Sequence, residues 1–118
     1  MRGVLTVTNV TAKGAVIASG AEHARTFWRR FLGLMGRPGL PTDGGLLISG
    51  DSSIHTFLMR FPIDVVYLDR EGRVLRRDSR MGPGRIGPLV RGCAHVLELA
   101  PGRLDEVPVE VGDQLTWS

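Results

Sequence analysis

Cysteine, lysine and aromatic residues are all scarce in this sequence. It contains one cysteine (Cys93), one lysine (Lys13), two Trp, one Tyr and four Phe. A single cysteine excludes an intrachain disulfide and is typical of a reducing compartment. No apolar run of about 18 residues occurs, and polar residues such as Asn9 interrupt the start of the chain, so neither a membrane span nor a secretory leader is predicted. We therefore expect a soluble, cytoplasmic protein with no membrane partner.

Turn-forming residues, in contrast, are abundant. The 118 residues include 16 Gly and 7 Pro, a proportion that favours many short strands joined by turns over long helices. A chain of this length buries roughly two thirds of its surface on folding, so it needs no disulfide or metal to stabilise its core. The composition predicts a single domain over residues 1–118 with a mainly β fold.

Segments rich in small or β-branched residues alternate with turn signals along the chain. The first two, residues 5–10 and 15–20, predict a β-hairpin. A second hairpin is predicted where residues 63–69 and 73–79 flank a turn that ends at Gly72. Further strands are predicted over residues 46–49, 53–59, 94–100, 107–111 and 114–118, and a long loop over residues 80–92.

One segment has the spacing of an amphipathic helix. Ser19 and Glu22 are three residues apart, as are the hydroxyl and carboxylate residues of a capping box. Apolar residues then recur every three or four positions, and Gly36 and Pro38 follow as stop signals. The pattern predicts one long helix at about residues 21–35, with an apolar stripe of Ala24, Phe27, Trp28, Phe31, Leu32 and Met35.

Five motifs occur in a recognisable order: LGLMGRPGL, GGLLI, IHTFLMRFPIDVVYLDREGRV, AHVLELAPG and VGDQL. With the predicted helix that ends in the first motif, they resemble domain-of-unknown-function family 192, an uncharacterised bacterial and archaeal family, over about residues 20–116. The resemblance implies a jelly-roll-like β-sandwich or barrel with one prominent α-helix, and it implies no established activity. Where the family commonly has an Asn-Thr pair, this chain has Arg60 and Phe61, whereas Asp64 and Glu98 match the family pattern.

The segment 53–69 places ionisable groups within strongly apolar sequence. Burying a charge is costly unless it is paired or used, so these groups form either a ligand site or structural contacts. We predict a pocket around residues 55–64, lined by His55, Met59, Arg60 and Asp64. The alternative is that Arg60 and Asp64 form a structural ion pair, and that His55 is a core histidine.

Glu98 is a further candidate for the ligand-binding set. It shares its strand face with Val96 and Ala100, while Leu97 and Leu99 form the other, more apolar face. The pattern leaves two interpretations open, a carboxylate that faces a ligand and one that faces water.

The sequence offers little for catalysis or metal binding. Cys93 and His95 share a strand face, the proximity that a thiol nucleophile and its base need. A small buried thiol is the simpler interpretation, because nothing places a third, orienting group beside them. Three histidines and one cysteine without paired spacing do not predict a zinc site. We expect no catalytic residue, no metal and no cofactor.

Charge is distributed unevenly along the chain. Residues 70–91 contain seven arginines against two acids, and residues 98–113 contain five acids against one arginine. Guanidinium groups bind phosphate well, so nucleic acid or an acidic protein is an alternative partner for residues 70–91. These arginines alternate between strand faces and have no aromatic residues among them for base stacking. We therefore do not expect a specific nucleic-acid site.

The hypothesis that fits these patterns best is a noncatalytic small-ligand or accessory binding protein with its pocket around residues 55–64. The expected partner is a small polar ligand or another protein, and the chain is expected to be a monomer or a homodimer. Two alternatives remain. One is an Arg-rich hairpin over residues 70–91 that binds nucleic acid or an acidic protein, and the other is an enzyme that the sequence does not reveal.

Overall fold

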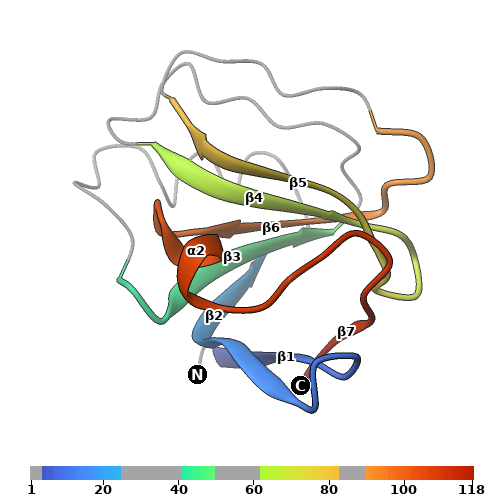
Figure 1. The fold of residues 1–118 in the computed structure, drawn as a ribbon, viewed down its shortest axis with the longest axis horizontal. Helices are drawn as coiled ribbons and strands as arrows, with labels where there is room; N and C mark the ends of the chain where they lie inside the picture. Colours follow the sequence, from blue (N-terminus) through green and yellow to red (C-terminus); the bar gives the residue numbers. More distant parts are fainter. Residues whose placement is uncertain (1–3, 25–40, 50–61, 83–89) are drawn as a thin grey trace.

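The computed structural model describes residues 4–24, 41–49, 62–82 and 90–118, which form one seven-stranded sheet with a short helix (Figure 1). The elements in chain order are β1 (Val4–Asn9), β2 (Ala15–Ala24), β3 (Gly44–Ser49), β4 (Ile63–Leu68), β5 (Val74–Met81), β6 (His95–Leu99), α2 (Arg103–Glu106) and β7 (Leu115–Trp117). The strand order is β5-β4-β6-β3-β2-β1-β7, with β2 and β3 parallel and all other neighbours antiparallel. The mainly β fold is confirmed.

Both hairpins predicted from the sequence are confirmed. β1 and β2 are antiparallel, and the turn between them places Lys13 (φ 58°) and Gly14 (φ 76°) in the left-handed region. β4 and β5 are joined by a turn in which the Asp69 carboxylate accepts hydrogen bonds from the N–H groups of Glu71 and Arg73. The strands predicted over residues 46–49, 94–100 and 114–118 correspond to β3, β6 and β7.

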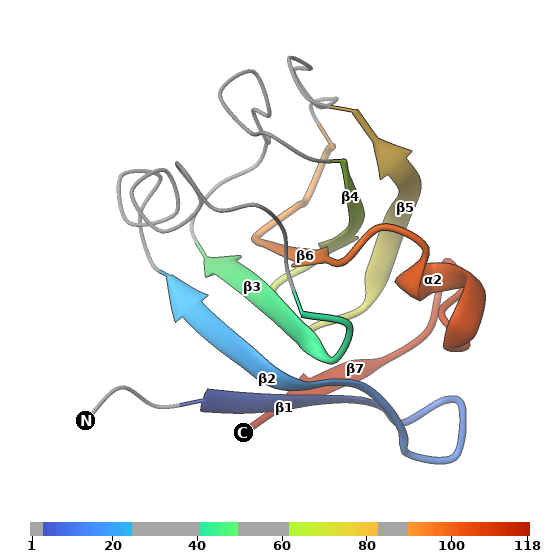
Figure 2. The same ribbon diagram turned by 90° about the vertical axis from the view of Figure 1, so that its left-hand side faces the viewer.

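The sheet is strongly curled, so that its two edge strands meet at one corner (Figure 2). Arg73, just before β5, forms an isolated antiparallel bridge with Gln114, just before β7. The Leu115 N–H donates to the Gly72 carbonyl at 2.9 Å beside this bridge. The described strands do not close into a barrel, and the jelly-roll-like arrangement is not confirmed.

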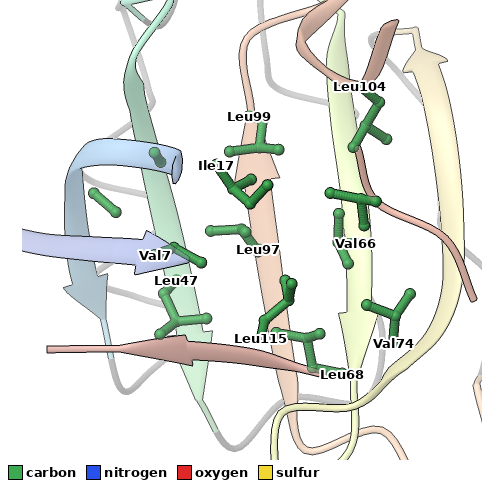
Figure 3. Packing of buried hydrophobic residues seen from close by; sticks show 13 residues of the cluster. Val7, Ile17, Leu47, Val66, Leu68, Val74, Leu97, Leu99, Leu104 and Leu115 are labelled. Carbon is green, nitrogen blue, oxygen red and sulfur yellow. The ribbon is translucent and has the colours of Figure 1, made fainter. Parts of the chain in front are cut away.

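The side chains of the sheet divide between two faces. The first face carries the larger hydrophobic cluster, which includes Leu47, Leu97 and Leu99 (Figure 3). Val7 of β1 and Leu115 of β7 belong to the same cluster. The second face carries a smaller cluster of buried residues: Leu46, Ile48, Ile63, Val65, Tyr67 and Val96. Because residues from both ends of the sheet meet in the larger cluster, the sheet curls around its first face.

The helix predicted at about residues 21–35 is wrong for its first residues. Residues 21–24 belong to β2, where Ala21 pairs with Leu5 of β1 on one side and with Gly45 of β3 on the other. A strand between two neighbours satisfies its backbone groups at both edges, which outweighs a local capping-box pattern. Residues 25–35 of the predicted helix lie outside the described residues.

In the part of the chain that is described, no helix has the length and apolar character needed to cross a membrane.

The strand predicted over residues 107–111 is also wrong. This segment follows α2 and is irregular. Two of its carbonyl groups accept hydrogen bonds from side chains instead of from a neighbouring strand: Asn9 donates to the Pro108 carbonyl at 2.8 Å, and Arg77 donates to the Val109 carbonyl at 2.6 Å. Pro108 has no N–H to contribute to a ladder, so the apolar alternation around it does not produce a strand.

Candidate functional site

Asp64, one of the predicted site residues, is fully buried on β4. Its Oδ1 atom accepts a hydrogen bond from the backbone N–H of Arg80 at 2.8 Å, and its Oδ2 atom accepts one from the backbone N–H of Leu104 at 2.8 Å. Arg80 has a positive φ of 51° near an irregularity in the β4–β5 pairing, and Leu104 lies in α2. Asp64 therefore connects β4 to β5 and to α2 through backbone groups.

These contacts assign a structural role to Asp64. Each carboxylate oxygen accepts a backbone N–H, as buried carboxylates do when they stabilise an irregular chain path. The predicted ion-pair partner, Arg60, lies outside the described residues, so that pair stays a prediction.

Glu98 is the other predicted site residue within the described part of the chain. It lies on β6 and has no exposed surface, so the interpretation in which it faces water is wrong. The residues directly opposite it are Leu46 on β3 and Val65 on β4. The Glu98 carboxylate is therefore placed on the second face, among the aliphatic side chains of the smaller cluster.

The second face carries another polar group, the Tyr67 hydroxyl. It donates a hydrogen bond to Asp78 Oδ2 at 3.2 Å. Burial raises the pKa of Tyr67, and the negative charge of Asp78 raises it further. Because both effects favour the protonated form, Tyr67 stays a neutral hydrogen-bond donor across the ordinary pH range.

The predicted site residues do not all lie on one side of the sheet. Asp64 is directly opposite Leu99 and belongs to the first face, whereas Glu98 is opposite Val65 and belongs to the second. His55, Met59 and Arg60 lie outside the described residues. The pocket predicted around residues 55–64 therefore stays a prediction.

A polar cluster that sequence reasoning missed lies on the first face. The Ser49 hydroxyl on β3 is 2.7 Å from His23 Nε2 on β2 and 2.8 Å from His95 Nδ1 on β6. The His95 ring meets Trp117 of β7 edge to face, with ring centroids 5.0 Å apart and planes at 71°. We call His23, Ser49, His95 and Trp117 the histidine cluster.

No local motif reveals the histidine cluster, because its members come from four strands. His23 and His95 are 26 and 46 residues from Ser49 in the chain, and only the position of β3 between β2 and β6 brings them together. The Cys93 and His95 side chains do not form the nucleophile and base that their spacing allowed. The Cys93 thiol donates to the His95 carbonyl at 3.3 Å, while the His95 ring nitrogen contacts Ser49.

Several arginines of residues 70–91 are engaged within the protein. Arg77 donates to the Val109 carbonyl at 2.6 Å, and Arg80 forms a salt bridge with Asp105 at 2.9 Å. Two others are held similarly, Arg73 by the Gly112 carbonyl and Arg76 by the Asp78 carboxylate. Guanidinium groups that bind the protein's own carbonyl and carboxylate oxygens are poorly arranged to follow a phosphate backbone.

We expect the protein not to bind nucleic acid specifically. Fluorescence anisotropy with labelled DNA and RNA, single- and double-stranded, should show no saturable binding at micromolar protein in about 150 mM salt. Saturable binding that disappears in the Arg76→Ala/Arg77→Ala double variant would show instead that these side chains leave their internal partners for phosphate.

The fold and its contacts define a small mainly β protein with one curled, open sheet and a buried acidic residue on each face. The chain belongs to domain-of-unknown-function family 192, described as an uncharacterised ACR, which it matches over residues 8–117. A UPF0127 protein of Pyrococcus furiosus is 32% identical over 117 residues, which cover 93% of this chain and 96% of that protein. The family resemblance seen in the sequence is confirmed.

Two solved structures share this architecture. A protein of unknown function from Novosphingobium aromaticivorans is 24% identical with a TM-score of 0.78, covering 96% of this chain and 83% of that chain. A protein from Sinorhizobium meliloti, described as a proposed transcription regulator, is 24% identical with a TM-score of 0.79, covering 98% of this chain and 95% of that chain. At this level of identity the likeness shows the β fold alone.

Proposed function

We propose that the protein is a noncatalytic binding protein for a small polar ligand, which lies against the second face of the sheet beside Glu98. Ligand sites combine apolar walls with a few convergent polar groups. The aliphatic residues of the smaller cluster would form the wall, and the Glu98 carboxylate would be one of the polar groups. In this proposal His55, Met59 and Arg60 complete the site, as predicted from the sequence.

The observation that carries the proposal is the complete burial of Glu98. Removing a carboxylate from water costs on the order of several kcal/mol before its contacts offset that cost. A leucine at the same position would extend the aliphatic cluster without this cost. A carboxylate at this position supports binding, because it is a polar group among apolar walls, and its natural complement is a ligand with a cationic or hydrogen-bond donor group.

Asp64 enters the proposal as a supporting residue. By holding the Arg80 and Leu104 backbone groups, it fixes the start of β4, which directly follows the predicted pocket segment.

The proposal also includes a cytoplasmic location, because a single cysteine is typical of reducing compartments.

The proposal predicts ligand-dependent stabilisation that requires Glu98. A thermal-shift screen should use small amines, amides and polyols as probes. A ligand present at about 100 times its Kd should stabilise the protein by about 2.7 kcal/mol, or roughly 10 °C in Tm. In the Glu98→Gln variant, the same compound should produce a much smaller rise in Tm, because the charged acceptor is lost.

A matched control for Glu98→Gln is Glu110→Gln, which makes the same chemical change at a side chain that is 80% exposed. Each variant is compared with and without the compound, so that differences in intrinsic stability cancel. We expect Glu110→Gln to respond as the parent protein does. If no compound in the set raises the Tm of the parent, or if Glu98→Gln responds fully, the proposed site is wrong.

A further inference from the structure

The hydrogen-bond chemistry of the histidine cluster is unusual. Ser49 has one hydroxyl proton, so it can donate to only one of the two imidazole nitrogens that contact its oxygen. The other nitrogen must then donate its own N–H to the Ser49 oxygen. His23 Nε2 and His95 Nδ1 thus both contact the Ser49 oxygen, at 2.7 and 2.8 Å, from the two strands on either side of β3.

We propose that His23 and His95 bind a divalent cation of the late first-row transition metals, such as Zn²⁺ or Cu²⁺. Neutral imidazole nitrogen is a preferred ligand of these cations, and Zn–N distances are about 2.0–2.1 Å. The His23 and His95 nitrogens converge on a position now occupied by the Ser49 hydroxyl. Small rotations of the rings and of the hydroxyl would place a cation between the nitrogens.

The surroundings suit such a site. The His95 ring is half-buried and in edge contact with Trp117, which restrains its orientation, whereas His23 is exposed and gives the cation a path from solvent. Both histidines lie on strands that pair directly with β3: His95 is directly opposite Ser49, and His23 is opposite Leu47, two residues before Ser49 on the same face. Because His95 is already oriented and His23 is accessible, the cation can bind without rearrangement of the sheet.

The described residues would supply two ligands, and water would complete the coordination. Among the described residues, no three His, Cys, Asp or Glu side chains are grouped as metal ligands. An imidazole pair completed by water gives an exchangeable site with open coordination positions, unlike a closed structural zinc site. The site lies on the first face and Glu98 on the second, so this inference is independent of the proposed function.

Trp117 provides a direct reporter, because Cu²⁺ bound at His95 should quench its fluorescence. The chain has two tryptophans, and the Trp28→Phe variant leaves Trp117 as the only one. Titration with CuCl₂ should quench this emission saturably, with one equivalent bound at micromolar concentration. Calorimetric titration of the unmodified protein with ZnCl₂ should give the same stoichiometry, and it does not depend on the tryptophan variant.

Single substitutions identify the ligands. We expect His23→Gln and His95→Gln each to abolish micromolar binding. His55→Gln, which changes the third histidine of the chain, and Cys93→Ser should leave binding unchanged. Ser49→Ala removes the hydroxyl that occupies the position and should bind at least as tightly as the parent. The inference is overturned if the parent shows no saturable binding, if either His23→Gln or His95→Gln still binds, or if His55→Gln or Cys93→Ser abolishes binding.

Discussion

Replacing Asp64 with alanine should lower the free energy of unfolding by about 2–5 kcal/mol. The substitution removes both acceptor atoms and leaves the backbone N–H groups of Arg80 and Leu104 without their partner. An unsatisfied buried donor costs about 1–3 kcal/mol. Urea denaturation followed by circular dichroism measures the loss. Asp64→Asn keeps one acceptor oxygen, so its loss should be smaller.

Asp105→Asn is the matched control for the Asp64 variants. Asp105 is exposed on α2 and forms its salt bridge with Arg80 at 2.9 Å, so the same charge is removed close by without uncovering a buried donor. Surface ion pairs contribute about 0–1 kcal/mol. Equal losses for Asp64→Ala and Asp105→Asn would contradict the structural role assigned to Asp64.

The Asp64 variants also separate fold from ligand binding. If Asp64 acts through the fold, Asp64→Asn should lower the Tm of the protein alone but keep the rise in Tm that a ligand produces. A loss of that rise would instead make Asp64 part of the binding site, as the sequence analysis predicted.

Replacing Gly72 with alanine should destabilise the protein by about 2–5 kcal/mol, because two costs add. Gly72 has a φ of +88°, a conformation that costs an L-residue roughly 1–2 kcal/mol. A Cβ atom at this position would also lie 2.5 Å from the Leu115 carbonyl oxygen, so the contact between the β4–β5 turn and β7 must open. Urea denaturation again provides the measurement.

Gly14→Ala isolates the conformational part of this cost. Gly14 has a similar φ of +76°, but a Cβ atom added there would meet nothing within 4 Å. Its substitution should therefore cost only about 1–2 kcal/mol. If both alanine variants lose the same free energy of unfolding, the close approach of β7 to Gly72 does not contribute to stability.

The two hairpins could be predicted from the sequence because their signals are local. In the second turn, the Asp69 carboxylate accepts N–H groups from residues two and four positions later, and Gly72 supplies the left-handed conformation. The first turn uses Lys13 and Gly14 in the same conformation. Turn chemistry of this kind depends on a few consecutive residues, so it can be recognised before the fold is known.

The start of the predicted helix shows where local signals fail. Ser19 and Glu22 have capping-box spacing, yet β2 continues through both residues because β1 and β3 pair with it. The positions of β1 and β3 beside β2 depend on residues far away in the chain, so no periodic pattern in the sequence predicts them.

Glu98 illustrates a related limit. Alternation along β6 correctly separated Glu98 from Leu97 and Leu99, but it could not determine that both faces of the strand are buried. Periodicity assigns residues to a face, whereas burial depends on what covers that face.

The sequence by itself determined the mainly β class, both hairpins, the strands over residues 46–49, 94–100 and 114–118, and the family to which the chain belongs. It also singled out Asp64 and Glu98 as charged residues in apolar segments. Only the tertiary structure decided that these two acids lie on opposite faces, that Asp64 binds backbone groups of β5 and α2, and that His23 and His95 meet at Ser49. The reason is physical. Turns and alternation depend on interactions between near neighbours, whereas strand order and register are set by the burial of side chains from the whole chain in one sheet.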